Sequence, residues 1–283
     1  MSSFREISCD TITKTVRELF LDANTVLGED VLSAVEKSIA REESELARYA
    51  LEKIEENAKV ARETSAPLCQ DTGLAVLFVE LGQDIHIAGG NFDEAIQRGV
   101  REAYKDGFLR KSVCDPLSRK NTGDNTPAII HTEIVDGNSI KITAMPKGGG
   151  SENMSSCTML LPAAGAEGLK KYIVEKVAQA GSNPCPPVIV GIGIGGSIEK
   201  SAILAKKALL RTVGEHNQSD GRLSELEDEI LEEINRLGIG PQGYGGRTTA
   251  LAVHIEMMPC HIASLPVTIN IQCHVARHKE AVI

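Results

Sequence analysis

The sequence predicts an α+β fold in which a helical N-terminal layer packs on a mixed β-sheet core. Residues 10–64 have helical periodicity, residues 74–79 form an apolar run of strand length, and strand-like and helical segments alternate from there on. A chain of 283 residues is long enough to bury a substantial core. We expect one domain over 1–283, with a helical region at about 1–64 and a core at about 65–283.

The N-terminal helices follow from the spacing of apolar residues. One helical face over residues 11–27 is formed by Ile12, Val16, Leu19, Phe20 and Ala23. A second helix is expected to begin near Asp30 and a third to run from about Glu42 to Glu63. The charged residues on these segments are expected to form a solvated face: Arg41, Glu42, Glu43 and Glu45.

The first part of the core combines a buried strand with a long polar loop. A strand is expected at 74–79 and a helix at about 92–106. The loop at 109–127 has little helix or strand signal, and its many hydrogen-bonding side chains indicate function. Strands near 128–135 and 139–145 flank a hairpin-type turn, Asp136-Gly137-Asn138.

The second part of the core repeats helix and strand signals. Helices are expected at about 164–179, 197–210 and 222–236, and a strand at 188–190. The chain from Gly238 is rich in glycine and then strand-like.

Residues 191–197 read GIGIGGS and follow a strand, as a dinucleotide-binding loop does. The third glycine comes too early for GxGxxG, and no acidic residue follows at the end of a second strand. We therefore interpret these glycines as sites of close packing or of anion contact near Cys185. A Rossmann-type dehydrogenase is the alternative from a different functional class.

Composition limits the partners. Thirty Lys and Arg against 39 Asp and Glu give a net charge of −9, and only 3% of residues are aromatic, which argues against nucleic-acid binding. A small anionic substrate remains compatible, because a few local Arg or Lys residues can hold it. The sequence shows no signal peptide and no membrane-spanning run, so a cytoplasmic protein is expected.

Cysteines provide the first chemical signal. The seven cysteines form no CxxC pair, and an odd number without secretory targeting argues against a disulfide framework. Cys69, Cys185 and Cys273 lie in segments rich in Pro, Gly or polar residues. Three thiolates from distant loops would suit an iron–sulfur cluster that keeps one iron without a protein ligand. The alternative is that they are buried free thiols.

Five motifs resemble class I fumarate hydratases and the related L-tartrate dehydratases: residues 67–73 (PLCQDTG), 119–127 (RKNTGDNTP), 147–153 (KGGGSEN), 185–187 (CPP) and 246–250 (GRTTA). The resemblance spans nearly the whole chain and implies the fold of the alpha subunit of these iron–sulfur hydro-lyases. It implies an oxygen-sensitive [4Fe–4S] cluster held by Cys69, Cys185 and Cys273, with Cys260 as the nearest alternative to the last.

The resemblance also implies the substrate contacts: Gln70, Asp71, Arg110, Gly149, Gly150 and His261. Asp71 and His261 are the candidate catalytic residues. The planar fork of an Arg suits a carboxylate, and glycines let backbone N–H groups approach one closely. His254, His274 and His278 match no family site.

The implied reaction is the reversible hydration of fumarate to (S)-malate, a step of the tricarboxylic acid cycle, with the open iron acting as a Lewis acid. A separate beta subunit would supply the base and further carboxylate contacts, in an α2β2 assembly. L-tartrate and mesaconate are alternative dicarboxylate substrates. A non-enzymatic iron–sulfur scaffold is a further alternative, but it would leave Arg110 and the triglycine segment (residues 148–150) without a function.

Overall fold

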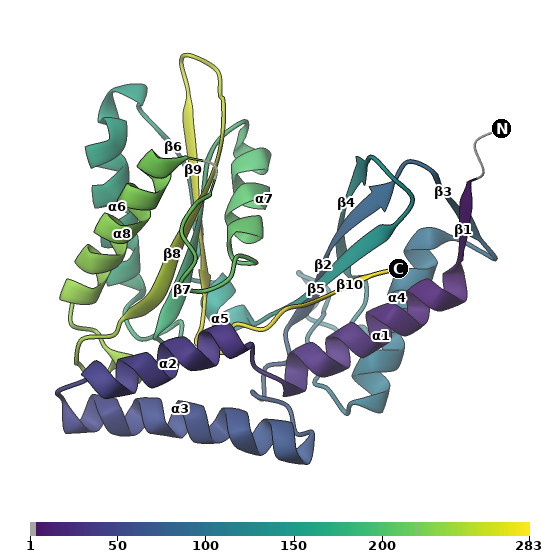
Figure 1. Ribbon diagram of the computed structural model, residues 1–283, viewed down its shortest axis with the longest axis horizontal. Helices are drawn as coiled ribbons and strands as arrows, with labels where there is room; N and C mark the ends of the chain where they lie inside the picture. Colours follow the sequence, from purple (N-terminus) through teal and green to yellow (C-terminus); the bar gives the residue numbers. More distant parts are fainter. Residues whose placement is uncertain (1–3, 219) are drawn as a thin grey trace. The chain divides into compact units, whose positions relative to one another are not determined.

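The computed structural model describes residues 4–218 and 220–283 (Figure 1). The described residues form two compact units. Unit 1 contains the described residues up to Leu27, Val60–Gly149 and Arg277–Ile283, and unit 2 contains Gly28–Lys59 and Gly150–Ala276. The predicted α+β class with mixed sheets is confirmed. A single domain over 1–283 stays a prediction, because two compact units can still unfold together.

Unit 1 is a sheet with the strand order β10-β5-β2-β4, covered on one face by α1 and α4. Ser8 caps α1 by accepting a hydrogen bond from Thr11 N–H at 3.1 Å, and Ile12, Val16 and Phe20 on the apolar face of this helix are fully buried. The elements in chain order are β1 (Arg5–Ser8), α1 (Cys9–Thr25), β2 (Leu74–Gly82), β3 (Ile85–Ala88), α4 (Phe92–Asp106), β4 (Ile129–Val135), β5 (Ile140–Lys147) and β10 (Lys279–Val282).

The predicted pairing of the strands around Asp136-Gly137-Asn138 is wrong. β4 and β5 both exist, but β2 lies between them, parallel to β4 and antiparallel to β5. β2 is the most apolar strand of this sheet and is buried along most of its length, so it takes a central position. The 136–139 turn instead wraps the end of β2, where Gly82 N–H donates to Ser139 O at 2.9 Å.

Unit 2 is built on a sheet with the strand order β6-β9-β7-β8, in which β7 and β8 are parallel and the other pairs antiparallel. Helices α6 and α8 pack on one face and α7 on the other (Figure 1). The elements in chain order are α2 (Glu29–Arg41), α3 (Glu45–Thr64, which ends in unit 1), α5 (Gly149–Glu152, which begins in unit 1), β6 (Ser156–Leu160), α6 (Gly165–Ala180), β7 (Val188–Gly195), α7 (Ile198–Ala208), α8 (Gly221–Arg236), β8 (Ala250–Met258) and β9 (Leu265–Gln272).

The glycines at 191–195 lie inside β7, not in a loop that follows it. A Cβ on Gly193 would lie 1.9 Å from Ser201 O, and one on Gly191 would lie 2.2 Å from Ala205 O. Both oxygens belong to α7, so these glycines let the helix backbone approach the strand closely. The close-packing interpretation is therefore confirmed, and the strand continues through the positions that a dinucleotide-binding loop would occupy.

The predicted helices over 10–64 are confirmed as α1, α2 and α3, but the expected solvation of Glu42 is wrong. Glu42 is only 2% exposed. Its Oε1 accepts from Glu43 N–H and Ser44 N–H at 3.0 and 3.1 Å, and its Oε2 accepts from Arg247 N–H at 2.9 Å. Among the helices of the described part, none has the length and apolar character needed to cross a membrane.

Candidate functional site

All seven cysteines lie in the described part of the chain and are free thiols. Cys69 belongs to unit 1, whereas Cys185 and Cys273 belong to unit 2. Over 4–218 and 220–283, no set of His, Cys, Asp or Glu side chains is grouped as a site for a single metal ion.

Cys69 lies in the loop that joins α3 to β2. The preceding residue is buried, and its N–H donates to Asn24 O at 2.8 Å, which anchors the loop on α1. The half-buried Sγ of Cys69 accepts from Asp71 N–H at 3.4 Å, and its thiol donates to Gln70 Oε1 at 3.4 Å. Backbone N–H groups that point at sulfur stabilise thiolates and tune clusters, so this environment suits a ligating cysteine.

Asp71 connects the cysteine loop to the triglycine segment. Its Oδ1 accepts from Gly73 N–H at 3.1 Å and its Oδ2 from Gly149 N–H at 2.7 Å. Gly73 has a φ of +78°, and a Cβ there would lie 2.7 Å from the main chain of Lys147, so only glycine fits. The role predicted for Gly149 N–H is to approach a substrate carboxylate. In the structure this N–H donates to the carboxylate of Asp71, and its role toward substrate stays a prediction.

Three polar side chains hold the carbonyls of residues 71–73. Arg277 Nη2 donates to the first carbonyl, Tyr104 Oη contacts the second and third at 2.7 and 2.9 Å, and Asn125 Nδ2 donates to the third at 3.1 Å. All three side chains are buried, and burial raises the pKa of Tyr104. Sequence reasoning missed these residues as site components, although Asn125 lies in one of the five motifs. Nothing in the sequence marks Tyr104 or Arg277 as buried donors.

Arg110 is brought to the same loop by its main chain. Thr72 Oγ1 donates to Arg110 O at 3.0 Å, and the Arg110 side chain is exposed. Gln70 is also exposed, next to the cysteine. Unit 1 thus brings together most of the predicted site residues: Cys69, Gln70, Asp71, Arg110 and Gly149.

Cys185 and Cys273 lie at one end of the sheet in unit 2, just before β7 and just after β9. His274 joins the two segments, because its N–H donates to Cys185 O at 3.4 Å and its Nδ1 lies 2.9 Å from the same oxygen. Gln242 Nε2 donates to Pro186 O at 2.8 Å and lies 3.1 Å from His274 Nδ1. His274 and Gln242 are therefore structural partners of the cysteine loops, a role that the sequence did not reveal.

Other family motifs support the same end of this sheet. A Cβ on Gly150 would lie 3.8 Å from Asn183 O, so the last glycine of the triglycine segment lies beside the Cys185 loop. Thr249 of the GRTTA motif accepts from Gly240 N–H at 3.2 Å through Oγ1, and its carbonyl accepts from Val188 N–H at 2.9 Å. These bonds tie Gly240 and Val188, the first residue of β7 after Cys185, to Thr249.

Cys260 and His261 lie at the opposite end of this sheet from Cys185 and Cys273. They belong to the turn between β8 and β9, and β8 ends beside the last residue of β7. The length of β7 separates the two ends by roughly 20 Å. Unit 2 therefore groups Cys273 rather than Cys260 with Cys185, and it does not bring His261 to these cysteines. The side chain of His261 is exposed, and its Nδ1 accepts from Ala263 N–H at 3.1 Å.

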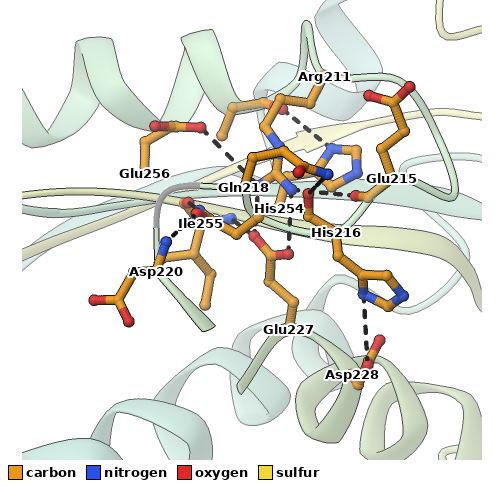
Figure 2. A network of polar contacts seen from close by, with 12 residues as sticks. Arg211, Glu215, His216, Gln218, Asp220, Glu227, Asp228, His254, Ile255 and Glu256 are labelled. Atoms are coloured by element: carbon orange, nitrogen blue, oxygen red, sulfur yellow. Dashed lines mark hydrogen bonds and ion pairs between the residues drawn. The ribbon is translucent and has the colours of Figure 1, made fainter. Parts of the chain in front are cut away.

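A separate polar cluster in unit 2 contains a buried histidine (Figure 2). His254 Nδ1 lies 3.1 Å from Ala208 O, which requires the proton on that nitrogen. Nearby, buried Glu227 accepts from Arg211 Nη1 at 2.5 Å and from Ile255 N–H at 2.7 Å. Burial, together with the charge of Arg211, lowers the pKa of His254 to about 4. This histidine matched no family site, and the structure gives it a role in the core.

Comparison with known proteins identifies the family. A family model described as fumarate hydratase (fumerase) matches residues 13–282. A Methanocaldococcus jannaschii protein, provisionally named L(+)-tartrate dehydratase subunit alpha, is 47% identical over 268 residues, which are 93% of this chain and 94% of that protein. L(+)-tartrate dehydratase subunit alpha of Escherichia coli K12 is 30% identical over 275 residues, 96% of this chain and 90% of that protein. The chain therefore belongs to the fumarate hydratase (fumerase) family and is a hydro-lyase.

Proposed function

We propose that this chain is the alpha subunit of an iron–sulfur hydro-lyase that hydrates fumarate reversibly to (S)-malate. The observation that supports it most is the grouping, within each unit, of residues that the family resemblance assigns to the site. Cys69, Asp71, Arg110 and Gly149 gather around one loop of unit 1, and Cys185 lies beside Cys273 in unit 2.

A [4Fe–4S] cluster held by Cys69, Cys185 and Cys273 fits the donor set. All three are free thiols outside the buried core, and Cys69 Sγ already accepts a backbone N–H. Three thiolates leave one iron of such a cluster without a protein ligand. When bound, that iron would supply Lewis-acid polarisation of the substrate hydroxyl and carboxylate.

The chain's own residues would bind and orient the substrate around this iron. The exposed guanidinium of Arg110 presents a planar fork that suits a substrate carboxylate. Asp71 uses both carboxylate oxygens to accept backbone N–H groups, which fixes the side chain in one orientation. Its remaining lone pairs would accept a hydrogen bond from the substrate hydroxyl, and the Gln70 amide would donate a hydrogen bond to the substrate beside it.

His261 would serve the site of a second copy of this chain. Its position at the far end of the unit 2 sheet separates it from Cys185 and Cys273 of its own chain. It lies in an exposed turn with Ile262, which is 94% exposed. An α2β2 assembly would supply that second copy. Mixing the inactive variants Cys185→Ser and His261→Ala should then restore part of the activity, and no recovery after subunit exchange would contradict this arrangement.

A beta subunit would complete the site. The relatives from M. jannaschii and E. coli are named as alpha subunits, and this chain covers at least 90% of each. We infer that the proton-abstracting base and further carboxylate contacts come from the partner. The isolated chain should therefore bind a cluster without turning over substrate.

L(+)-tartrate is the second candidate substrate, because both relatives carry the name of L(+)-tartrate dehydratase. The test is anaerobic co-expression with the beta subunit, followed by assays of fumarate, L(+)-tartrate and mesaconate side by side. The proposal expects the highest kcat/KM with fumarate. A higher value with L(+)-tartrate would transfer the assignment to that substrate, and no turnover of any of the three would refute the proposed function.

A further inference from the structure

Arg277 is a buried cation in the candidate site of unit 1. It follows Cys273 by four residues, just before β10, and only 4% of it is exposed. Its Nη2 donates to the main-chain oxygen of Asp71. Asp71 is thereby held at three points, since Gly73 N–H and Gly149 N–H bind its two carboxylate oxygens.

The other donors of this guanidinium are not used within the chain. Nε and Nη1 of Arg277 are both buried and have no hydrogen-bond partner among the described residues. An arginine stays charged in proteins, and buried charged N–H groups are nearly always paired. The positive charge of Arg277 and the carboxylate of Asp71 act in opposite directions on the pKa of Tyr104, so all three groups lie close together.

We propose that Arg277 is both the positioning residue for Asp71 and a further anion-binding residue of the site. Nη2 fixes the main chain of Asp71, while Nε and Nη1 donate to an anionic acceptor. That acceptor is either a sulfur of the bound cluster or a carboxylate of the substrate, because both carry negative charge in a poorly solvated place. This inference rests on the proposed function.

The test uses the αβ complex prepared without oxygen. Arg277→Lys keeps the charge and a donor but loses the fork, whereas Arg277→Ala removes both. Arg236→Lys is the matched control, because its side chain is 68% exposed and pairs on the surface with Glu232. For each variant, iron and acid-labile sulfide, the urea unfolding midpoint, kcat, KM and the affinity for succinate are measured. Succinate is a dicarboxylate that cannot lose water, and its binding is followed by calorimetry.

The expected result is an Arg277→Lys complex with the same urea midpoint as Arg236→Lys but with a defective site. If the acceptor is the cluster, iron and sulfide fall. If the acceptor is the substrate, iron stays and succinate binds about tenfold more weakly or worse. Guanidinium ion, added below denaturing concentration, should restore to the Arg277→Ala complex whichever of the two it has lost, its iron and sulfide content or its affinity for succinate.

The inference is overturned if the Arg277→Lys complex matches the wild-type complex in iron content, sulfide content and succinate affinity. This holds even if the Arg277→Ala complex is unstable or defective. Failure of the proposed function has a different signature. A wild-type complex that turns over no candidate dicarboxylate would refute that function, while iron retention and succinate binding would still decide the role of Arg277.

Discussion

The buried His254 should make stability depend on pH in a defined window. Above pH 6.5, the ordinary pKa of this residue, its imidazole is neutral in both the folded and the unfolded chain. Between pH 6.5 and about 4 the unfolded chain takes up a proton that the folded chain rejects, because burial and Arg211 lower the folded pKa. Acidification therefore favours unfolding through this group. At 1.36 kcal/mol per pKa unit, this group lowers the free energy of unfolding by about 3 kcal/mol when the pH has fallen to 4.

The assay compares the wild-type chain with His254→Gln, whose amide can still donate to Ala208 O. The free energy of unfolding in urea is measured from pH 4 to 7.5 for both chains, and for the control His86→Gln, which alters an exposed residue of β3. The carboxylates are common to all chains, so the difference between wild type and His254→Gln isolates this histidine. That difference should change by about 3 kcal/mol across the window. A difference that stays flat with pH would refute the reasoning.

Three further predictions concern the packing and the candidate site. Gly193→Ala should lower the free energy of unfolding by about 1–3 kcal/mol, because its Cβ would lie 1.9 Å from Ser201 O. The control Gly221→Ala, which has open space around its Cβ, should leave the free energy of unfolding unchanged. Equal urea midpoints for the two variants would contradict this account. Arg110→Lys should weaken substrate binding by about 1.5–3 kcal/mol with iron content unchanged. Wild-type steady-state kinetics in this variant would contradict a role for Arg110 in substrate binding. Asp71→Asn should reduce kcat more than it raises KM, since one backbone N–H loses its carboxylate acceptor; an increase in KM alone would argue for simple binding.

Local sequence patterns predicted the helices well and the strand pairing poorly. The apolar spacing in α1 and α4 marks the face that each helix buries, which is a property of neighbouring residues. The pairing of β2 with β4 and β5 depends on which strand is buried on both faces, and the turn between β4 and β5 carries no information about an inserted strand. The short strands β1 and β3 were not predicted, because four residues are too few to show a period.

The candidate site was predictable where its residues are close in sequence. Cys69, Gln70 and Asp71 are consecutive, and the structure keeps them beside one another. Arg277 and Tyr104 act through hydrogen bonds to carbonyls that any residue type could present, so their role follows from the fold alone. The family resemblance implies a substrate contact for His261, but β9 carries the chain across the length of the sheet between His261 and Cys273.

Iron and acid-labile sulfide analysis of cysteine variants tests the central claim most directly. The αβ complex is prepared without oxygen with Cys69→Ser, Cys185→Ser or Cys273→Ser, and with the controls Cys114→Ser and Cys260→Ser. Cys114 is half-buried, as Cys69 is, and Cys260 is exposed, as Cys185 is. We predict that each of the first three variants loses iron and sulfide together, whereas both controls retain wild-type amounts. Wild-type iron and sulfide in the Cys185→Ser complex, or their loss in the Cys260→Ser complex, would contradict the assignment of the cluster ligands.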